Sequence, residues 1–338
     1  MEGNKGKLLV DATCAPADIA YPCGLTLLNK EREKTEEIID TLHKSDKWKG
    51  KKVRTYRIKA RKEYLKVSKK RKKNEQEIRR AVRKQLGYIN RNLLHIKEME
   101  TVTTYKALSK KEYRNLLVCS EVYRQQWEMY KERTHRIENR IVSIRQPYVR
   151  PIVRGKAGAP VEFGAKLTIS VVDGFTFIEK ISWENYNEGI DLIEQIERYR
   201  NRFGYYPESV HGDKIYQNRA NRQFCKTHQI RMSGPPLGRP LKEKEEQREK
   251  KKQREQDERD RIPVEGKFGT AKRRYGLNRI LTKRKETSET TIALIILVMN
   301  LEKLRVQFLF VLYYSPGECT EIRNNFDRNI AFPISKAS

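Results

Sequence analysis

The sequence of 338 residues has few of the features that mark secreted, zinc-binding or membrane proteins. Its five cysteines are odd in number and never spaced as CxxC, which argues against a disulfide framework and a zinc finger and suits a reducing cytoplasm. The first residues, MEGNKGKLLVDAT, contain no long apolar run such as a signal peptide has. The most apolar stretch, 291–314, carries Glu302, Lys303 and Arg305 near its middle, which disfavours a membrane span and indicates a buried helix leading into a strand or a second helix.

Acidic residues are also scarce relative to basic ones. The 73 Lys and Arg outnumber the 44 Asp and Glu, so the formal net charge is +29 and the isoelectric point is near 9.9. An excess of this size indicates a polyanionic partner, for which nucleic acid is the first candidate and an anionic membrane surface the second. The sequence contains no phosphate-binding glycine loop and no convincing Ser/His/Asp arrangement, and Gly234-Pro235-Pro236 predicts only a turn.

Basic residues are concentrated in one segment, 44–84, which contains 20 Lys and Arg and only 4 Asp and Glu, a net charge of +16. Apolar residues recur at helical spacing around it, so residues 29–150 are expected to form a basic, mainly helical insertion with a last helix at 110–144. Its aromatic residues Trp48, Tyr56 and Tyr64 are expected to pack between helices rather than to stack on bases. Five consecutive basic residues predict a surface that binds DNA phosphates, with a solvated helix face as the alternative: Lys69, Lys70, Arg71, Lys72 and Lys73.

Outside this block, strand and helix patterns alternate. Residues 7–12 (KLLVDA) predict a buried strand, and Asp173-Gly174 between two β-rich runs predicts a hairpin. The order of elements predicts an α/β protein with a mixed sheet and flanking helices. The later elements are expected as a helix at 187–203, a strand at 208–211, a helix at 218–228, a strand at 230–232, and helices at 264–275 and 287–304. The expected parts are 1–28 (first strand and loop), 29–150 (the insertion), 151–314 (the rest of the sheet domain, with a charged linker at 242–260) and 315–338 (a loose tail).

Three carboxylates stand where such a sheet can bring them together. Asp11 ends the first predicted strand, Asp213 follows the strand around Val210, and Glu265 begins a helix after the charged linker. Carboxylates at adjacent strand ends, met by one from a helix, suit two divalent ions, because Mg²⁺ prefers oxygen ligands. The alternative for each aspartate is a turn or a helix cap, and three acids can be chosen in many ways from the 44 of this chain.

Three motifs surround these acids: DATCAPADIAYP from Asp11, SVHGDKIYQNRANRQFC around Asp213 and RIPVEGKFGTAKRRYGLNRI around Glu265. In these motifs the sequence resembles the DDE transposases of bacterial insertion sequences, in the insertion sequence five group, and the resemblance extends from LLVDATCAPADIAYP to TTIALIILVMNLEKL. The third motif has Arg261 four residues before Glu265 and Lys272 seven residues after it, as in the Arg–Glu–Lys spacing of that family.

The resemblance implies an RNase H-like mixed sheet and an enzyme that cleaves a phosphodiester at a transposon end and joins the freed 3′-hydroxyl to target DNA. It implies that Asp11, Asp213 and Glu265 are catalytic and hold two Mg²⁺ or Mn²⁺ ions. Arg261 and Lys272 would contact DNA phosphates or orient Glu265. The implied partners are double-stranded DNA and further copies of the chain on that DNA, with no membrane, in a bacterial cytoplasm in association with the nucleoid.

Two departures from the family pattern leave alternatives open. Glu258 stands where the family usually has a tyrosine, three residues before the arginine. The first motif begins almost at the N-terminus, so we expect the helical region that usually precedes it to be missing, as in a truncated frame, a split element or a remnant. The alternative functions are an inactive DNA-binding remnant, an unrelated basic nucleic-acid-binding protein and a nuclease that cleaves without joining.

Three further residues near these motifs are weaker candidates for the active site. His211 is expected to end a strand as a packed or exposed side chain, and Glu184 is expected to be a surface carboxylate. For Tyr216, a position near DNA and a packing role at a helix start are equally compatible with the sequence.

Overall fold

The computed structural model describes residues 3–21, 24–45, 47–103, 105–153, 161–234 and 244–314. The expected tail at 315–338 and the turn at Pro235-Pro236 lie outside the described residues. Among the described helices, none combines the length and the apolar composition that crossing a membrane requires.

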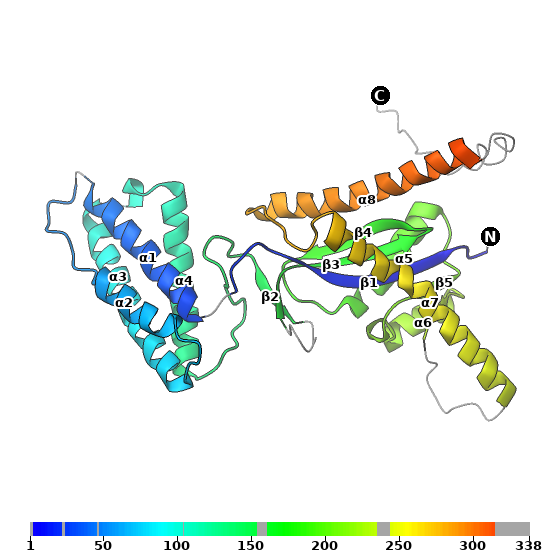
Figure 1. The fold of residues 1–338 in the computed structure, drawn as a ribbon, viewed down its shortest axis with the longest axis horizontal. Helices are drawn as coiled ribbons and strands as arrows, with labels where there is room; N and C mark the ends of the chain where they lie inside the picture. The colour runs from blue at the N-terminus through cyan, green and yellow to red at the C-terminus, as the bar shows by residue number, and fades with distance from the viewer. Residues whose placement is uncertain are drawn as a thin grey trace.

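A six-stranded mixed sheet forms the body of the protein (Figure 1). Strand β3 is antiparallel to β1 on one side and to β2 and β4 on the other, whereas β5 is parallel to β1 and β6 is parallel to β5. The expected α/β fold with a mixed sheet is confirmed, as is the hairpin, whose turn residue Asp173 has a φ of 48°. The strands are β1 (Lys7–Pro16), β2 (Arg150–Val153), β3 (Val161–Val172), β4 (Phe175–Ser182), β5 (Ser209–His211) and β6 (Arg231–Met232).

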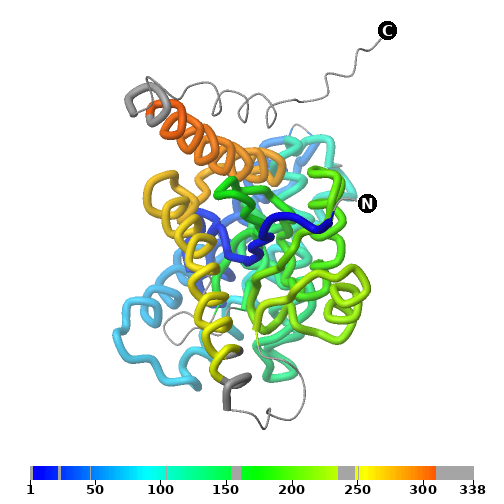
Figure 2. Tube along the Cα trace, turned by 90° about the vertical axis from the view of Figure 1, so that its right-hand side faces the viewer, coloured from blue at the N-terminus to red at the C-terminus, as the bar shows by residue number. Residues whose placement is uncertain are grey.

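Helices cover both faces of this sheet, and alternate side chains of β1 pack against the helices of opposite faces. Leu8 and Val10 pack with α5 (Leu192–Phe203) and α6 (Arg219–Thr227) on one face. Leu9 packs on the other face with α7 (Lys244–Arg274) and α8 (Lys285–Tyr314). Figure 2 shows α7 and the α5–α6 region on opposite sides of β1. Because successive strand residues point to opposite faces, Asp11 lies on the same face as Leu9 and therefore on the α7 face.

The insertion between β1 and β2 is a bundle of four helices that lies beside the sheet (Figure 1). The helix expected at 110–144 is wrong at its C-terminal end. It begins at a capping box formed by Ser109 and Glu112 and ends at Lys131, two residues before Arg133 adopts a left-handed φ of 54°. The helices are α1 (Gly24–His43), α2 (Arg57–Ser68), α3 (Glu75–Thr103) and α4 (Lys110–Lys131), and short 3-10 turns occur at η1 (Tyr105–Ala107), η2 (Glu188–Ile190) and η3 (Lys214–Tyr216).

The segment predicted as a charged linker at 242–260 is helical from residue 244, as the first half of α7. The helix continues through Pro263, although a proline inside a helix removes one backbone donor and its ring crowds the preceding turn. Asp257 accepts two hydrogen bonds from Arg231 on β6, at 2.7 and 3.0 Å, and Asp260 accepts one from Lys7 on β1 at 2.7 Å. These contacts fasten the charged half of α7 to the edge of the sheet.

The bundle interior holds an ionisable residue that has no hydrogen-bond partner within the described part of the chain. Glu31 on α1 is wholly buried, and both of its carboxylate oxygens lack such a partner. Its neighbour Arg32 is equally buried but donates to Glu36 Oε1 at 2.5 Å and to Asn29 Oδ1 at 2.9 Å. Burial raises the pKa of Glu31 well above its usual value, so the folded bundle favours the neutral acid.

We therefore expect the Glu31→Gln variant to be more stable than the wild type at pH 8 and similar to it at pH 4. A raised folded-state pKa means that wild-type stability is highest below about pH 4.5 and falls as the pH rises, whereas glutamine does not titrate. Thermal unfolding at both pH values measures the effect, at about 2–4 °C per kcal/mol. Glu37→Gln, at an exposed position of the same helix, is the control, and equal midpoints for Glu31→Gln and wild type at pH 8 would contradict the expectation.

Candidate active site

The parallel pairing of β1 with β5 brings Asp11 and Asp213 together. The last residue pair between these strands is Leu9 and His211. Asp11 and Asp213 each lie two residues further along, so both are expected on the same face of the sheet as that pair. β1 itself continues beside β3, where Asp11 pairs with Ile169, whereas β5 ends at His211. The two aspartates therefore meet at the point where β5 separates from β1.

Gly212 makes this separation sterically possible. A Cβ atom at this position would lie 2.8 Å from Tyr216 Cδ2 and 2.8 Å from Val10 Cγ2, closer than real Cβ contacts allow. The backbone between β5 and η3 thus packs directly against β1 and the buried Tyr216 ring. This close approach holds the backbone of Asp213 beside β1.

Helix α7 supplies the third carboxylate from the same face. Val264 and Phe268 are buried in the core beneath the helix, which fixes the rotation of α7 about its axis. Asp257, Arg261 and Glu265 follow one another at four-residue intervals, so they form one row along the helix. Asp257 lies near His211, with 3.8 Å between its Oδ1 and the imidazole Nδ1, and Arg261 reaches Asp213, so this row follows the edge formed by β5 and its continuation.

Arg261 bridges two of the three acids. Its Nη2 atom forms an ion pair with Oδ1 of Asp213 and lies 3.7 Å from Oε1 of Glu265. The Asp213 and Glu265 side chains are 53% and 66% exposed, so both remain accessible from solvent. The expectation that Arg261 orients Glu265 or contacts DNA is untested, but its position beside both acids is compatible with either role.

The three acids line one open cavity of about 850 Å³. Lys272 also lines it, about two turns of α7 beyond Glu265. Sequence reasoning missed Glu188 and Lys166, which pair with each other in the wall of the cavity, while Lys166 Nζ also donates to the carbonyl oxygen of Tyr186 at 2.6 Å. No pattern in the sequence marks them, because Lys166 lies in the middle of β3 and Glu188 begins the short 3-10 turn η2 after β4.

The negative charges in the cavity repel one another. The pKa of Asp11 is raised to about 6, chiefly by burial and further by the nearby charges of Asp213 and Glu265. The backbone N–H of Ala12, which donates to Asp11 Oδ1 at 2.7 Å, and the guanidinium of Arg261 act in the opposite direction. An additional cation at this point would favour the ionised form of Asp11.

The chemistry of these donors fits a divalent cation of the magnesium type, which prefers carboxylate oxygens and retained water. The carboxylate oxygens of the three acids are, however, more widely spaced than the ligand atoms of a closed metal site. In the described part of the chain, three candidate ligand atoms within 4.8 Å of one another occur at His211, Asp257 and Asp260, and the acids of the cavity do not form such a group. Arg261 lies between Asp213 and Glu265, so a cation that all three acids bind must displace its guanidinium.

The compact group of His211, Asp257 and Asp260 lies outside this cavity. Both carboxylates already have cationic partners, Arg231 and Lys7 respectively. His211 is wholly buried, and burial lowers its pKa, so it is a packed strand residue as expected. The imidazole Nε2 of His211 lies 2.9 Å from Ser209 Oγ on β5, and its Nδ1 faces Asp257 on α7. The group therefore links α7 to the edge of the sheet.

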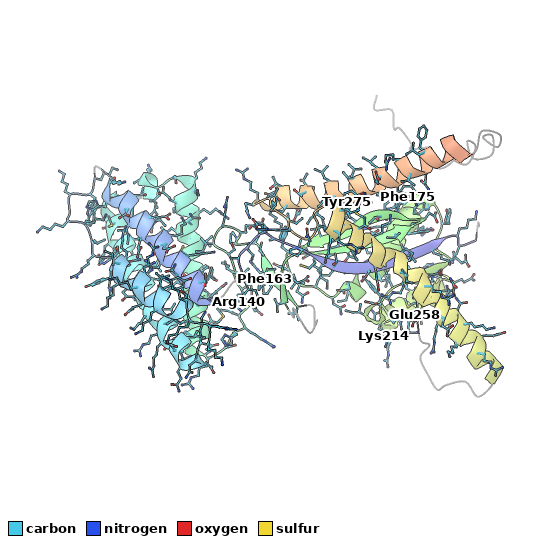
Figure 3. All side chains as sticks on the ribbon, in the orientation of Figure 1. Arg140, Phe163, Phe175, Lys214, Glu258 and Tyr275 are labelled. Carbon is cyan, nitrogen blue, oxygen red and sulfur yellow. The ribbon has the colours of Figure 1, made fainter. Side chains whose placement is uncertain are left out.

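The structure also places the remaining residues that the sequence singled out. Lys69–Lys73 lie in the loop between α2 and α3 of the bundle and do not line the cavity. Glu184 is exposed, as expected, and Tyr216 is buried in the core, which favours its packing role. Glu258 is an exposed residue of α7 (Figure 3). In the bundle, Trp48 and Tyr64 pack against its core. The Tyr56 ring instead contacts two guanidinium groups, those of Arg54 and Arg91, at 4.6 and 4.7 Å from the ring centre.

Comparison with known protein families gives a match over part of the chain. The family model described as "Transposase DDE domain" matches residues 210–302. The matched segment contains Asp213, Arg261, Glu265 and Lys272, and it supports a DDE transposase as the identity of the domain. No curated protein and no solved structure gives a match. Asp11 lies outside the matched segment, so its place in the site rests on the geometry of β1 and on the first motif.

Proposed function

We propose that this protein is a DNA transposase that cleaves and joins strands at transposon ends, with Asp11, Asp213 and Glu265 as metal-binding catalytic residues. The observation that carries the proposal is that these acids, from β1, the end of β5 and α7, line a single open cavity. The family match over 210–302 supports the transposase assignment. The spacing of Arg261, Glu265 and Lys272 supports the finer assignment to the insertion sequence five group.

In this proposal the three carboxylates hold two Mg²⁺ or Mn²⁺ ions. When bound, such ions supply charge stabilisation for the attacking and leaving oxygens of phosphodiester exchange. Asp11 provides the most buried carboxylate, and the Ala12 N–H fixes one of its oxygens. Arg261 pairs with Asp213 and approaches Glu265, and its guanidinium would be available to a DNA phosphate if these two acids held metal instead. Lys272 lines the same cavity and supplies a second cationic side chain for the DNA backbone.

The bundle has a separate part in the proposal. Its loop of five basic residues, 69–73, binds the phosphates of double-stranded DNA outside the cavity, where it contributes affinity without sequence information. Copies of the chain assemble on the DNA, since two ends have to be joined to one target. In a bacterial cell the protein would therefore be found with the nucleoid.

The test is cleavage and joining of a labelled transposon-end duplex in the presence of Mg²⁺ or Mn²⁺. Wild type and Glu265→Gln are compared, and DNA binding is measured for both. Metal-dependent cutting and joining by the wild type, with binding but no cutting by the variant, is the expected result. Equal binding without cutting by either would favour a DNA-binding remnant, and cutting without joined products would favour a nuclease.

A further inference from the structure

Helix α8 has an apolar side that the described residues leave exposed, although the sequence predicts a buried helix. Ile292, Ile295, Ile296 and Met299 are buried against the sheet, as expected for the apolar stretch at 291–314. The opposite side of the helix is also apolar, yet it is exposed. We call it the α8 stripe, and it consists of Leu294, Leu297, Val298, Leu301 and Phe308, each between 45% and 56% exposed.

The spacing of the α8 stripe is that of a helix-pairing surface. Leu294, Leu301 and Phe308 follow one another at seven-residue intervals, and Leu297 and Val298 fill the half-interval between the first two. Apolar residues repeating every three to four positions allow a second helix to insert its side chains between them. The stripe extends over 15 residues, or about 22 Å of helix.

The position of α8 keeps this surface open. Lys303 donates to the carbonyl oxygen of Asp173, and its ammonium lies 4.0 Å from the centre of the Phe175 ring. Figure 3 shows Phe175 beneath α8, and Figure 1 shows the helix continuing beyond the hairpin. The described part of α8 is thus held by its sheet side alone, with the stripe directed away from the sheet.

Charge is absent from the N-terminal half of this surface. No charged residue occurs from Thr290 to Leu301, in a chain of which 35% is charged and whose net charge is +29. The next charged residues towards the C-terminus are Glu302, Lys303 and Arg305. Glu302 and Arg305 pair with each other at 2.7 Å, and Lys303 is bound to the Asp173 carbonyl on the sheet side, so little unpaired charge remains beside the stripe. Two copies of this basic chain can therefore approach one another along residues 290–301 without bringing like charges together.

We propose that the α8 stripe pairs with the α8 stripe of a second copy of this chain. The same helix provides both the knobs and the holes, so a two-fold arrangement satisfies both copies at once. One pair of stripes is smaller than the roughly 800 Å² per partner of a standard interface, so association alone is weak, on the order of micromolar. This pairing deepens the assembly that the proposed function requires, and it rests on that function only for its biological purpose.

The pairing is tested by sedimentation equilibrium of the full chain at about 1–100 µM, in high salt without DNA or metal. The wild type should show a concentration-dependent monomer–dimer equilibrium, and Leu301→Glu should raise the dissociation constant at least tenfold. Val306→Glu is the matched control, because Val306 is equally exposed, at 53%, but lies about 140° around the helix from Leu301. Circular dichroism and thermal unfolding of both variants show whether the fold is retained.

A second comparison makes the result specific. An equal mixture of Leu301→Glu and Leu301→Lys should restore association, since Leu301 lies at the centre of the stripe and meets its counterpart in a two-fold pair. A monomeric wild type, or a dimer that Leu301→Glu leaves unchanged, overturns the proposal. Association gained only after removal of residues 315–338 also overturns it, by showing that this segment covers the stripe. None of these readouts uses catalysis, so failure here is distinct from failure of the transposase proposal.

Discussion

Replacing Asp11 by asparagine should abolish metal-dependent DNA cleavage while making the metal-free protein more stable at pH 8. The carboxylate is one of three proposed metal ligands, and losing the charge stabilisation it organises should lower the cleavage rate by about a thousandfold or more. Asparagine keeps an oxygen for the Ala12 N–H, so the backbone of β1 has no reason to move. The variant therefore separates catalysis from folding.

The predicted gain in stability has a definite pH dependence. The folded-state pKa of Asp11 is about 6, above its ordinary value of 3.8, so the wild type loses stability as the pH rises between these values. The asparagine variant has no such loss, and its advantage in thermal midpoint should be present at pH 8 and absent at pH 3.5. Saturating Mg²⁺ should reverse the order at pH 8, because only the wild type gains from binding the ion.

Glu184→Gln is the control for these measurements, because it removes the same charge from an exposed position outside the cavity lining. It should leave cleavage and the Mg²⁺ dependence of stability unchanged. Wild-type cleavage by Asp11→Asn would remove β1 from the catalytic site. A lower thermal midpoint of Asp11→Asn at pH 8 would contradict the account of a carboxylate raised in energy by burial and like charge.

The sequence locates the two aspartates because the backbone alone determines where they lie. A short apolar run predicts β1, the SVHGD segment predicts a strand and a turn, and period-two alternation directs both acids to one face. Glu265 could be recognised only from the spacing of its motif, since it is one acid among many on a charged helix and no periodicity distinguishes it. The contact of Arg261 with both Asp213 and Glu265 depends on the rotation of α7 about its axis, which Val264 and Phe268 set only in the folded protein.

Where the predicted secondary structure differs from the observed one, contacts between residues distant in the sequence account for the difference. The charge of residues 242–260 predicts a linker, but Asp257 and Asp260 bind the edge of the sheet, and the segment is helical from residue 244. Strand β2 is short and contains Pro151, so only its pairing with β3 reveals it. The apolar stretch 291–314 predicts a helix that leads into a strand or a second helix, whereas α8 is one continuous helix from Lys285 to Tyr314. Its composition also does not show that one side of the helix has no covering element in the described chain.

Neutralising the basic loop of the bundle should weaken DNA binding without changing the chemistry in the cavity. Removing one cation that binds a DNA phosphate should lower the slope of log affinity against log salt by about 0.9, so replacing the five residues of 69–73 with glutamine should lower it by about 2–4. We give less than the full value because Lys70 already pairs with Glu77 at 2.5 Å. Affinity at moderate salt should fall about tenfold to a hundredfold, measured by fluorescence anisotropy over a salt series.

The matched control removes five positive charges from exposed positions of the charged half of α7: Arg248, Lys251, Lys252, Arg254 and Arg259. If net charge alone attracts DNA, both sets of substitutions should lower the salt slope equally, and the loop would have no special role. If the loop 69–73 is a binding surface, its substitution should have the larger effect. Cleavage at saturating DNA should then stay close to wild type, because the loop lies outside the cavity that Asp11, Asp213 and Glu265 line. A cleavage rate that falls together with affinity even at saturation would instead mean that the bundle positions DNA for the reaction itself.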